Sequence, residues 1–212
     1  MKRAAIDIGS NSVLLLAGEV GESFNESINE AAIAGLGKGI DKTGEFSAIA
    51  MEDTVRILEQ YTKLIKDYGV NPADVLVAAT EAARVAKNSK QFFLEIQHKL
   101  GLNVRIITTK AEAHFTALGV YRGANFKNTA VLVDLGGAST EFIKIQSDPF
   151  SILNTISLPI GSVRASDWAT DHKLEQNITN AYESFSRELG DYKAEKFFIG
   201  VAGSITAIVA MI

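Results

Sequence analysis

The feature that most constrains this chain is a pattern that occurs twice. AAIDIGSNSVLLL near the N-terminus reads as an apolar strand, an aspartate, a glycine-containing polar turn and a second strand, and AVLVDLGGASTEFI repeats this plan. The aspartates are Asp7 and Asp134. In each half a later apolar strand gives way to a helical pattern, at Thr80 and at Ser204. The repeat predicts an α/β protein of two similar halves.

The other apolar patterns predict how each half is organised. Periodicity of the helical kind over 47–68 ends at Gly69, and GLGKGI before it is interpreted as a mobile loop. The first half is completed by expected strands over 74–80 and 103–109 and expected helices over 81–88, 90–100 and 110–121. The weakly apolar stretch RGANFKNT is the expected boundary, so the predicted domains are 1–124 and 125–212. Few residues follow Ser204, which indicates an incomplete second domain, the alternative being a short one.

Composition excludes several classes of protein. The chain contains no cysteine, which removes disulfides, thiolate metal sites and cysteine nucleophiles. Its net charge is −4 and no Lys/Arg run occurs, so nucleic acid is not an expected partner. We find neither a signal peptide at the N-terminus nor an apolar run of the roughly 18 residues that a membrane span needs. A cytoplasmic protein is expected.

The repeated turn indicates a chemistry. Glycine lets the backbone approach a ligand and point N–H groups at phosphate oxygens, and a nearby carboxylate can hold a hydrated Mg²⁺. A single turn of this kind is more often a plain hairpin with a solvated aspartate. Its presence at matched places in two halves favours a phosphate and metal site, because two facing turns would close on one ligand.

Five segments, in order, carry a resemblance to a known family: AAIDIGSNSVLLL, ATEAARVAKN, KAEAHFTALGV, VLVDLGGASTEF and SLPIGSVR. Together they resemble the exopolyphosphatase and guanosine pentaphosphate phosphohydrolase family of the actin, sugar kinase and Hsp70 superfamily. The resemblance implies duplicated actin-like (ribonuclease H-like) domains with an interdomain cleft. It also implies Mg²⁺-dependent hydrolysis of a phosphoanhydride, releasing terminal phosphate from inorganic polyphosphate or pppGpp.

The resemblance assigns roles to five charged residues. Glu112 matches the glutamate expected to orient or deprotonate the attacking water, and Arg84 matches an arginine expected to pair with phosphate oxygens. Asp134 and Glu141 are expected to organise metal and water, with Asp7 as the counterpart of Asp134 across the cleft. From the residues alone, the pattern favours Glu112 as a favourable first-turn acid of the helix, and Arg84 could equally be a solvated helix-face side chain.

The turns supply the expected phosphate-binding groups. Their hydroxyl and amide side chains could instead form the turns and cap backbone groups, and both roles can coexist. In SLPIGSVR, Gly161 and Arg164 lie at an expected helix start that could add amides to the site, or form an ordinary strand-to-helix junction. The predicted phosphate-binding residues are Gly9, Ser10, Asn11, Gly136, Gly137, Ser139 and Thr140.

The sequence departs from the family pattern at several positions. Ala138 replaces the third glycine of the second turn, and its methyl group would crowd a phosphate or require a conformation open to L-residues. Ala202, Ser204, Lys110 and His114 also differ from the usual residues. The alternatives are therefore a noncatalytic alarmone or nucleotide binder, or an ATP-dependent kinase of the superfamily. The preference between polyphosphate and pppGpp, and assembly as a homodimer, are left open.

Overall fold

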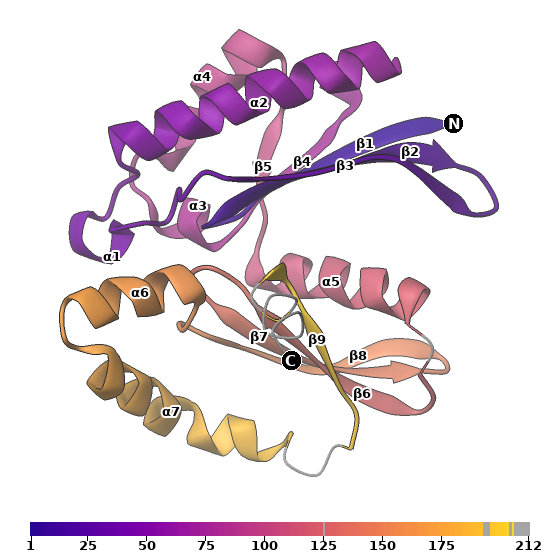
Figure 1. Cartoon of the computed structure of the whole chain (residues 1–212). Helices are drawn as coiled ribbons and strands as arrows, with labels where there is room; N and C mark the ends of the chain where they lie inside the picture. The colour runs from indigo at the N-terminus through magenta and orange to yellow at the C-terminus, as the bar shows by residue number, and fades with distance from the viewer. Residues whose placement is uncertain (125, 193–195, 204, 206–212) are drawn as a thin grey trace. The chain divides into compact units, whose positions relative to one another are not determined.

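The structure is a computed structural model, and it describes residues 1–124, 126–192, 196–203 and 205. It divides into two compact units, Met1–Ile107 and Thr108–Ile212. Each unit contains one mixed β-sheet with helices packed on it (Figure 1). The α/β architecture predicted from the repeat is confirmed. The helix expected after Ser204 falls largely on residues outside the described ones.

The first sheet has five strands in the order β3-β2-β1-β4-β5. The first three form an antiparallel meander, and β4 and β5 add in parallel to β1. A parallel neighbour needs a crossover connection, and the helical segment before β4 supplies it. The strands are β1 Lys2–Ile8, β2 Ser12–Val20, β3 Phe24–Ile33, β4 Leu76–Ala79 and β5 Val104–Ile106.

Helix α2 begins and ends where the sequence indicates, whereas the helix expected over 81–88 ends at Val85. The Ser47 side chain caps α2 by accepting a hydrogen bond from the Ala50 amide, and Gly69 ends the helix with φ 93°. In Figure 1, α2 and α4 cover the same face of the first sheet. The helices are α1 Ile40–Thr43, α2 Ala48–Tyr68, the 3₁₀ turn Pro72–Asp74, α3 Glu81–Val85 and α4 Ser89–Leu100.

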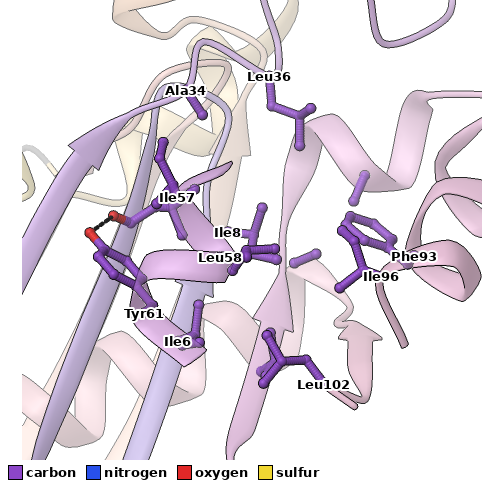
Figure 2. Packing of buried hydrophobic residues seen from close by; sticks show 14 of the residues in the cluster. Ile6, Ile8, Ala34, Leu36, Ile57, Leu58, Tyr61, Phe93, Ile96 and Leu102 are labelled. Carbon is purple, nitrogen blue, oxygen red and sulfur yellow. Dashed lines mark hydrogen bonds between the residues drawn. The ribbon is translucent and has the colours of Figure 1, made fainter. Parts of the chain in front are cut away.

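The core of the first unit lies between the sheet and these helices. Ile6 and Ile8 alternate with exposed residues along β1 and meet Leu58 from α2 (Figure 2). The Tyr61 hydroxyl, also from α2, donates to the Val13 carbonyl at 3.1 Å, so the one polar atom of this aromatic side chain has a partner. This packing holds β1 and β2 rigidly, and the first turn joins them.

The second sheet repeats the first, with the order β8-β7-β6-β9. Strands β6, β7 and β8 form the meander, and β9 pairs in parallel with β6. Helix α5 packs its Ala113 and Ala117 on one side of this sheet, while Tyr192 after α7 packs on the other. The elements are α5 Thr109–Gly123, β6 Thr129–Leu135, β7 Thr140–Ser147, β8 Phe150–Leu158, α6 Ser162–Thr170, α7 Leu174–Gly190 and β9 Phe198–Val201.

Helix α5 belongs to the second compact unit. Its alanines contact Leu132 and Ile143 of the second sheet, and the compact units divide between Ile107 and Thr108. The domain boundary predicted from sequence lies after residue 124, because it was placed at the polar stretch between the two repeats. It stays a prediction of where the second repeat begins. The consequence for function is that Glu112, on α5, shares a unit with Asp134.

Candidate active site

The two predicted turns are built alike. In the first, the Gly9 amide donates to the Ser12 carbonyl at 2.9 Å, and in the second the Gly136 amide donates to the Ser139 carbonyl at 3.0 Å. A Cβ added to either glycine would lie 3.2 Å from the same acceptor carbonyl oxygen, so both turns require a close backbone approach. The repeat inferred from sequence therefore extends to the hydrogen bonds of the turns.

The carbonyl groups of the first turn are bound from behind by the chain that follows β3. The Gly37 amide donates to the Ser10 carbonyl at 2.7 Å, and the Ala34 and Gly35 amides donate to the Asn11 carbonyl at 2.9 and 2.8 Å. Gly37 also packs so closely that an added Cβ would lie 2.9 Å from the Ser10 Cβ. The segment interpreted as a mobile loop is thus a support for the turn, and that interpretation is corrected.

The second turn is supported by the start of α6. The Ser162 amide donates to the Gly136 carbonyl at 3.0 Å, and the Val163 and Arg164 amides donate to the Gly137 carbonyl at 2.8 and 3.1 Å. A Cβ on Gly161 would lie 2.5 Å from the Ala138 nitrogen, so only glycine fits at this position. The expected helix start at Gly161 is confirmed, and its amides serve the turn's own carbonyls.

Supporting the carbonyls has a consequence for the amides. In a planar trans peptide the C=O of one residue and the N–H of the next point in opposite directions. With the carbonyls of Gly136 and Gly137 held toward α6, the N–H groups of Gly137 and Ala138 point away from it. The same geometry turns the Asn11 and Ser12 amides away from residues 34–37. Successive amides aimed to one side make an anion-binding concavity.

Three carboxylates gather beside the second turn. Asp134, near the end of β6, lies directly opposite Glu141 on β7. The charge of Glu112, in the first turn of α5, acts on Glu141 together with that of Asp134. The structure thus brings together, within one unit, three of the five charged residues predicted from sequence.

The environment raises the proton affinity of two of these carboxylates. Burial raises the pKa of Glu141 to about 7, hydrogen bonds from Ser157 and Ser139 oppose the rise, and the charges of Glu112 and Asp134 add to it. Burial also raises the pKa of Asp134, against a hydrogen bond from Thr116. A glutamate with a pKa near neutrality can exchange a proton under physiological conditions, which is the property of a general acid or base.

The carboxylate cluster fits one kind of metal ion. Among the described residues, no group of three or more His, Asp or Glu side chains is arranged to enclose a metal. Mg²⁺ does not need such a cage, because it keeps several waters and binds through one or two carboxylates plus substrate phosphates. Asp134 beside outward-pointing amides suits that mode of binding. A divalent cation there would also reduce the repulsion among the three carboxylates.

The predicted site residues of the first unit form a separate set. Asp7 lies on β1 opposite Leu14 of β2. The Arg84 guanidinium donates to the Glu81 carboxylate, at 2.8 Å from Nη2, and to the Ile107 carbonyl at 2.9 Å from Nη1. Helix α3, which carries Arg84, begins at Glu81, and its N-cap residue Thr80 directly follows β4, which pairs with β1.

Several small side chains of the turns are buried. Ser10 is 5% exposed and packs on Gly37, Thr140 Oγ1 donates to the Ile160 carbonyl at 2.6 Å, and Ser139 is hydrogen-bonded to Glu141. These contacts favour the capping and positioning roles of the hydroxyl groups. Phosphate binding by the predicted turn residues stays a prediction, and it rests on their amides.

Ala138 fits the turn without strain. Its methyl group is buried, at 4% exposure, and it is not among the described residues with positive φ. The alanine therefore needs no backbone conformation that is reserved for glycine. The substitution of the family's glycine gives no structural reason for weakened catalysis.

Sequence reasoning missed two residues that hold the carboxylates in place. Thr116 Oγ1 donates to Asp134 Oδ2 at 3.2 Å, and Ser157 Oγ donates to Glu141 Oε1 at 2.7 Å. Thr116 follows Glu112 by one helical turn and so shares its face of α5. Ser157 opens the quoted segment SLPIGSVR, and strand register places it across from Glu141. The helical spacing from Glu112 could have identified Thr116 from the sequence, whereas the strand register that identifies Ser157 could not be read from it.

A separate groove of about 790 Å³ runs along α5 and the edge strand β8. Lys110, His114 and Phe115 line it from the helix, and Phe150–Thr155 line it from the strand. None of the three carboxylates lines this groove, so the candidate site is the turn and not this groove.

These features define a class of protein and then a family. Each unit contains a β-meander with a glycine-containing turn after its first strand. Two such units are the arrangement found in actin-like domains. The model of the Ppx/GppA phosphatase family matches residues 18–211. The chain therefore belongs to the Ppx/GppA phosphatase family, as its motifs predicted.

Comparison with individual proteins agrees with this membership. The chain is 33% identical to the bifunctional 3-dehydroquinate synthase/phosphatase of Fusobacterium nucleatum, over 99% of its own length but 34% of that protein. It thus spans about a third of this curated relative. An Aquifex aeolicus PPX-GPPA enzyme is 31% identical with a TM-score of 0.78, and the match covers 100% of this chain and 71% of that one.

More distant structures share the fold. A Cytophaga hutchinsonii exopolyphosphatase superposes with a TM-score of 0.87 at 23% identity, covering 100% of this chain and 70% of the other. The predicted actin-like fold is confirmed. In the described part of the chain, we find no helix with the length and hydrophobicity needed to cross a bilayer.

Proposed function

We propose that this protein is a Mg²⁺-dependent phosphohydrolase that releases the terminal phosphate of inorganic polyphosphate or pppGpp. The observation that supports this most directly is the second turn, where amides directed to one side adjoin Asp134, Glu141 and Glu112. Phosphoryl transfer depends on positioning and electrostatic stabilisation, and this arrangement can supply both. Family membership supports the same reaction class.

Each part of the site has a role in this proposal. The outward amides of Gly137, Ala138 and Ser139 bind oxygens of the terminal phosphate, and Asp134 would hold a Mg²⁺ that would neutralise its charge. Glu112 orients the attacking water or accepts its proton. Glu141, with its pKa of about 7, is the second carboxylate able to exchange a proton there. In the first unit, Asp7 is proposed as a metal ligand and Arg84 as a residue that pairs with phosphate oxygens.

Phosphate release from polyphosphate, pppGpp and ATP in the presence of Mg²⁺ tests the proposal. Glu112→Gln keeps the shape of the side chain and removes its proton affinity, so we expect turnover to fall roughly 10²- to 10⁴-fold. Glu183→Gln, at an exposed position of α7, is the matched control and should keep full activity.

The same assay separates the alternative functions. Substrate binding without any release, in wild type and variant alike, would favour the noncatalytic binder and contradict the proposal. Consumption of ATP only when a second acceptor is present would favour the kinase. Ala138 was the main argument for the binder, and its ordinary backbone conformation, outside the positive-φ region, weakens that argument.

A further inference from the structure

Arg164 is a buried cation in the second unit. It lies in the first turn of α6 with only 9% of its surface exposed. Its guanidinium Nη1 donates to the Ala138 carbonyl at 2.6 Å, and its backbone amide donates to the Gly137 carbonyl at 3.1 Å. One residue thus binds two successive peptide groups of the turn.

These two hydrogen bonds determine the direction of two amides. Because C=O and N–H of a trans peptide point in opposite directions, holding the Gly137 and Ala138 carbonyls toward Arg164 directs the Ala138 and Ser139 amides away from it. A charged donor makes a stronger hydrogen bond than a neutral one. Arg164 therefore acts on the turn from the side opposite to its amides.

The first turn achieves the same result without a side chain. The Asn11 carbonyl, which corresponds to that of Ala138 in the repeat, accepts the backbone amides of Ala34 and Gly35. In the second unit the backbone amides of α6 reach only the two preceding carbonyls, those of Gly136 and Gly137. The guanidinium supplies the donor for the third carbonyl.

We propose that Arg164 is a positioning residue that orients the amides of the second turn toward a phosphate group and does not itself contact substrate. This rests on the proposed function, in which those amides bind the terminal phosphate. Arginine suits the task because its guanidinium is always charged and planar, so it can hold a carbonyl in one direction inside the protein. A helix-start arginine that bound substrate directly would have to expose its guanidinium instead.

Arg164→Ala tests the proposal, with Arg187→Ala on the exposed surface of α7 as the control. Removing a charged donor from a buried carbonyl should lower kcat on tripolyphosphate ~10- to 100-fold. Guanidinium ions at millimolar concentration should restore part of the loss, whereas urea, which is similar in shape but uncharged, should not. Hydrogen exchange measured on peptides covering 136–140 should become faster in Arg164→Ala and remain unchanged in Arg187→Ala.

The outcomes separate this proposal from the proposed function. Unchanged kcat and unchanged exchange at 136–140 in Arg164→Ala would overturn it. So would an activity loss that guanidinium does not restore and that accompanies faster exchange throughout the second sheet, because this would indicate a general structural role. If the wild-type protein releases no phosphate from any substrate, the proposed function fails. In that case, exchange at 136–140, with and without tripolyphosphate, still decides the role of Arg164.

Discussion

The two turns share one backbone design and differ in what lies next to it. In the first, the residue opposite Asp7 is Leu14, an exposed apolar side chain. In the second, the residue opposite Asp134 is Glu141, which is buried at 2% exposure. The duplicated frame can present amides at both places, and among the described residues of its own unit the second turn has two further carboxylates, Glu141 and Glu112, near Asp134. In the proposed function, the second unit therefore supplies more of the reacting groups.

Of the changes that compare the two turns, substitution of the two aspartates is expected to have the largest effect. Asp134→Asn should lower kcat/KM for polyphosphate roughly 10²- to 10³-fold, because it removes charge from the cluster proposed to hold Mg²⁺. Asp7→Asn, the matched change in the first turn, should cost about tenfold or less. Phosphate-release kinetics at several Mg²⁺ concentrations measure both. Equal losses would show that the turns contribute equally and would remove the basis of the comparison.

A second prediction concerns the pH dependence of stability. The folded pKa of Glu141 is about 7 against an ordinary value of 4.5, so the folded state binds this proton more tightly than the unfolded state. The stabilisation is present below about pH 4.5 and is lost as pH rises through about 7. Glu141→Gln removes this dependence. Relative to wild type, the variant should gain up to about 3 kcal/mol between pH 4.5 and pH 8.

Denaturant unfolding across this pH range, without Mg²⁺, is the measurement. Leu14→Gln places the same side chain at the matched position of the first turn, where no titrating group is removed, so its difference from wild type should not vary with pH. A Glu141→Gln difference that is also constant with pH would contradict the prediction.

A third prediction compares the two supporting glycines. Gly161→Ala would drive a methyl group into the backbone of Gly137 and Ala138, which cannot move without breaking the turn, and should destabilise the protein by about 2–3 kcal/mol. Gly37→Ala meets the Ser10 Cβ at 2.9 Å and should cost about 1 kcal/mol. Thermal unfolding of both variants tests the order. If Gly37→Ala proved the more damaging, the first turn would be the more rigid of the two.

The smallest effects are expected from the residues that orient the carboxylates. Ser157→Ala removes the 2.7 Å hydrogen bond to Glu141, and losing one such donor corresponds to about 1 kcal/mol, or a fivefold change in kcat. Because this bond lowers the pKa of Glu141, the pH profile of kcat should move to higher pH. A change in kcat without any movement of the profile would show that Ser157 acts only on structure.

Much of the fold could be predicted from the periodicity of apolar residues and from the residues that begin and end helices. Ser47 and Gly69 bound α2 as expected, and β1 follows alternating burial. The position of α5 could not be predicted in this way. Its small buried residues, Ala113 and Ala117, could pack on either sheet, and only the three-dimensional contacts assign it to the second unit.

The candidate site divides in the same manner. The sequence by itself determined the repeat, the two turns and the identity of the acidic residues, because these are local patterns of residue type and spacing. Only the tertiary structure decided that Glu112 joins Asp134 and Glu141, that Ser157 lies across from Glu141, and that Arg164 faces the turn's carbonyls. Strand register and helix docking create those contacts between residues distant in sequence, and the direction of a peptide group depends on the partner that binds its carbonyl.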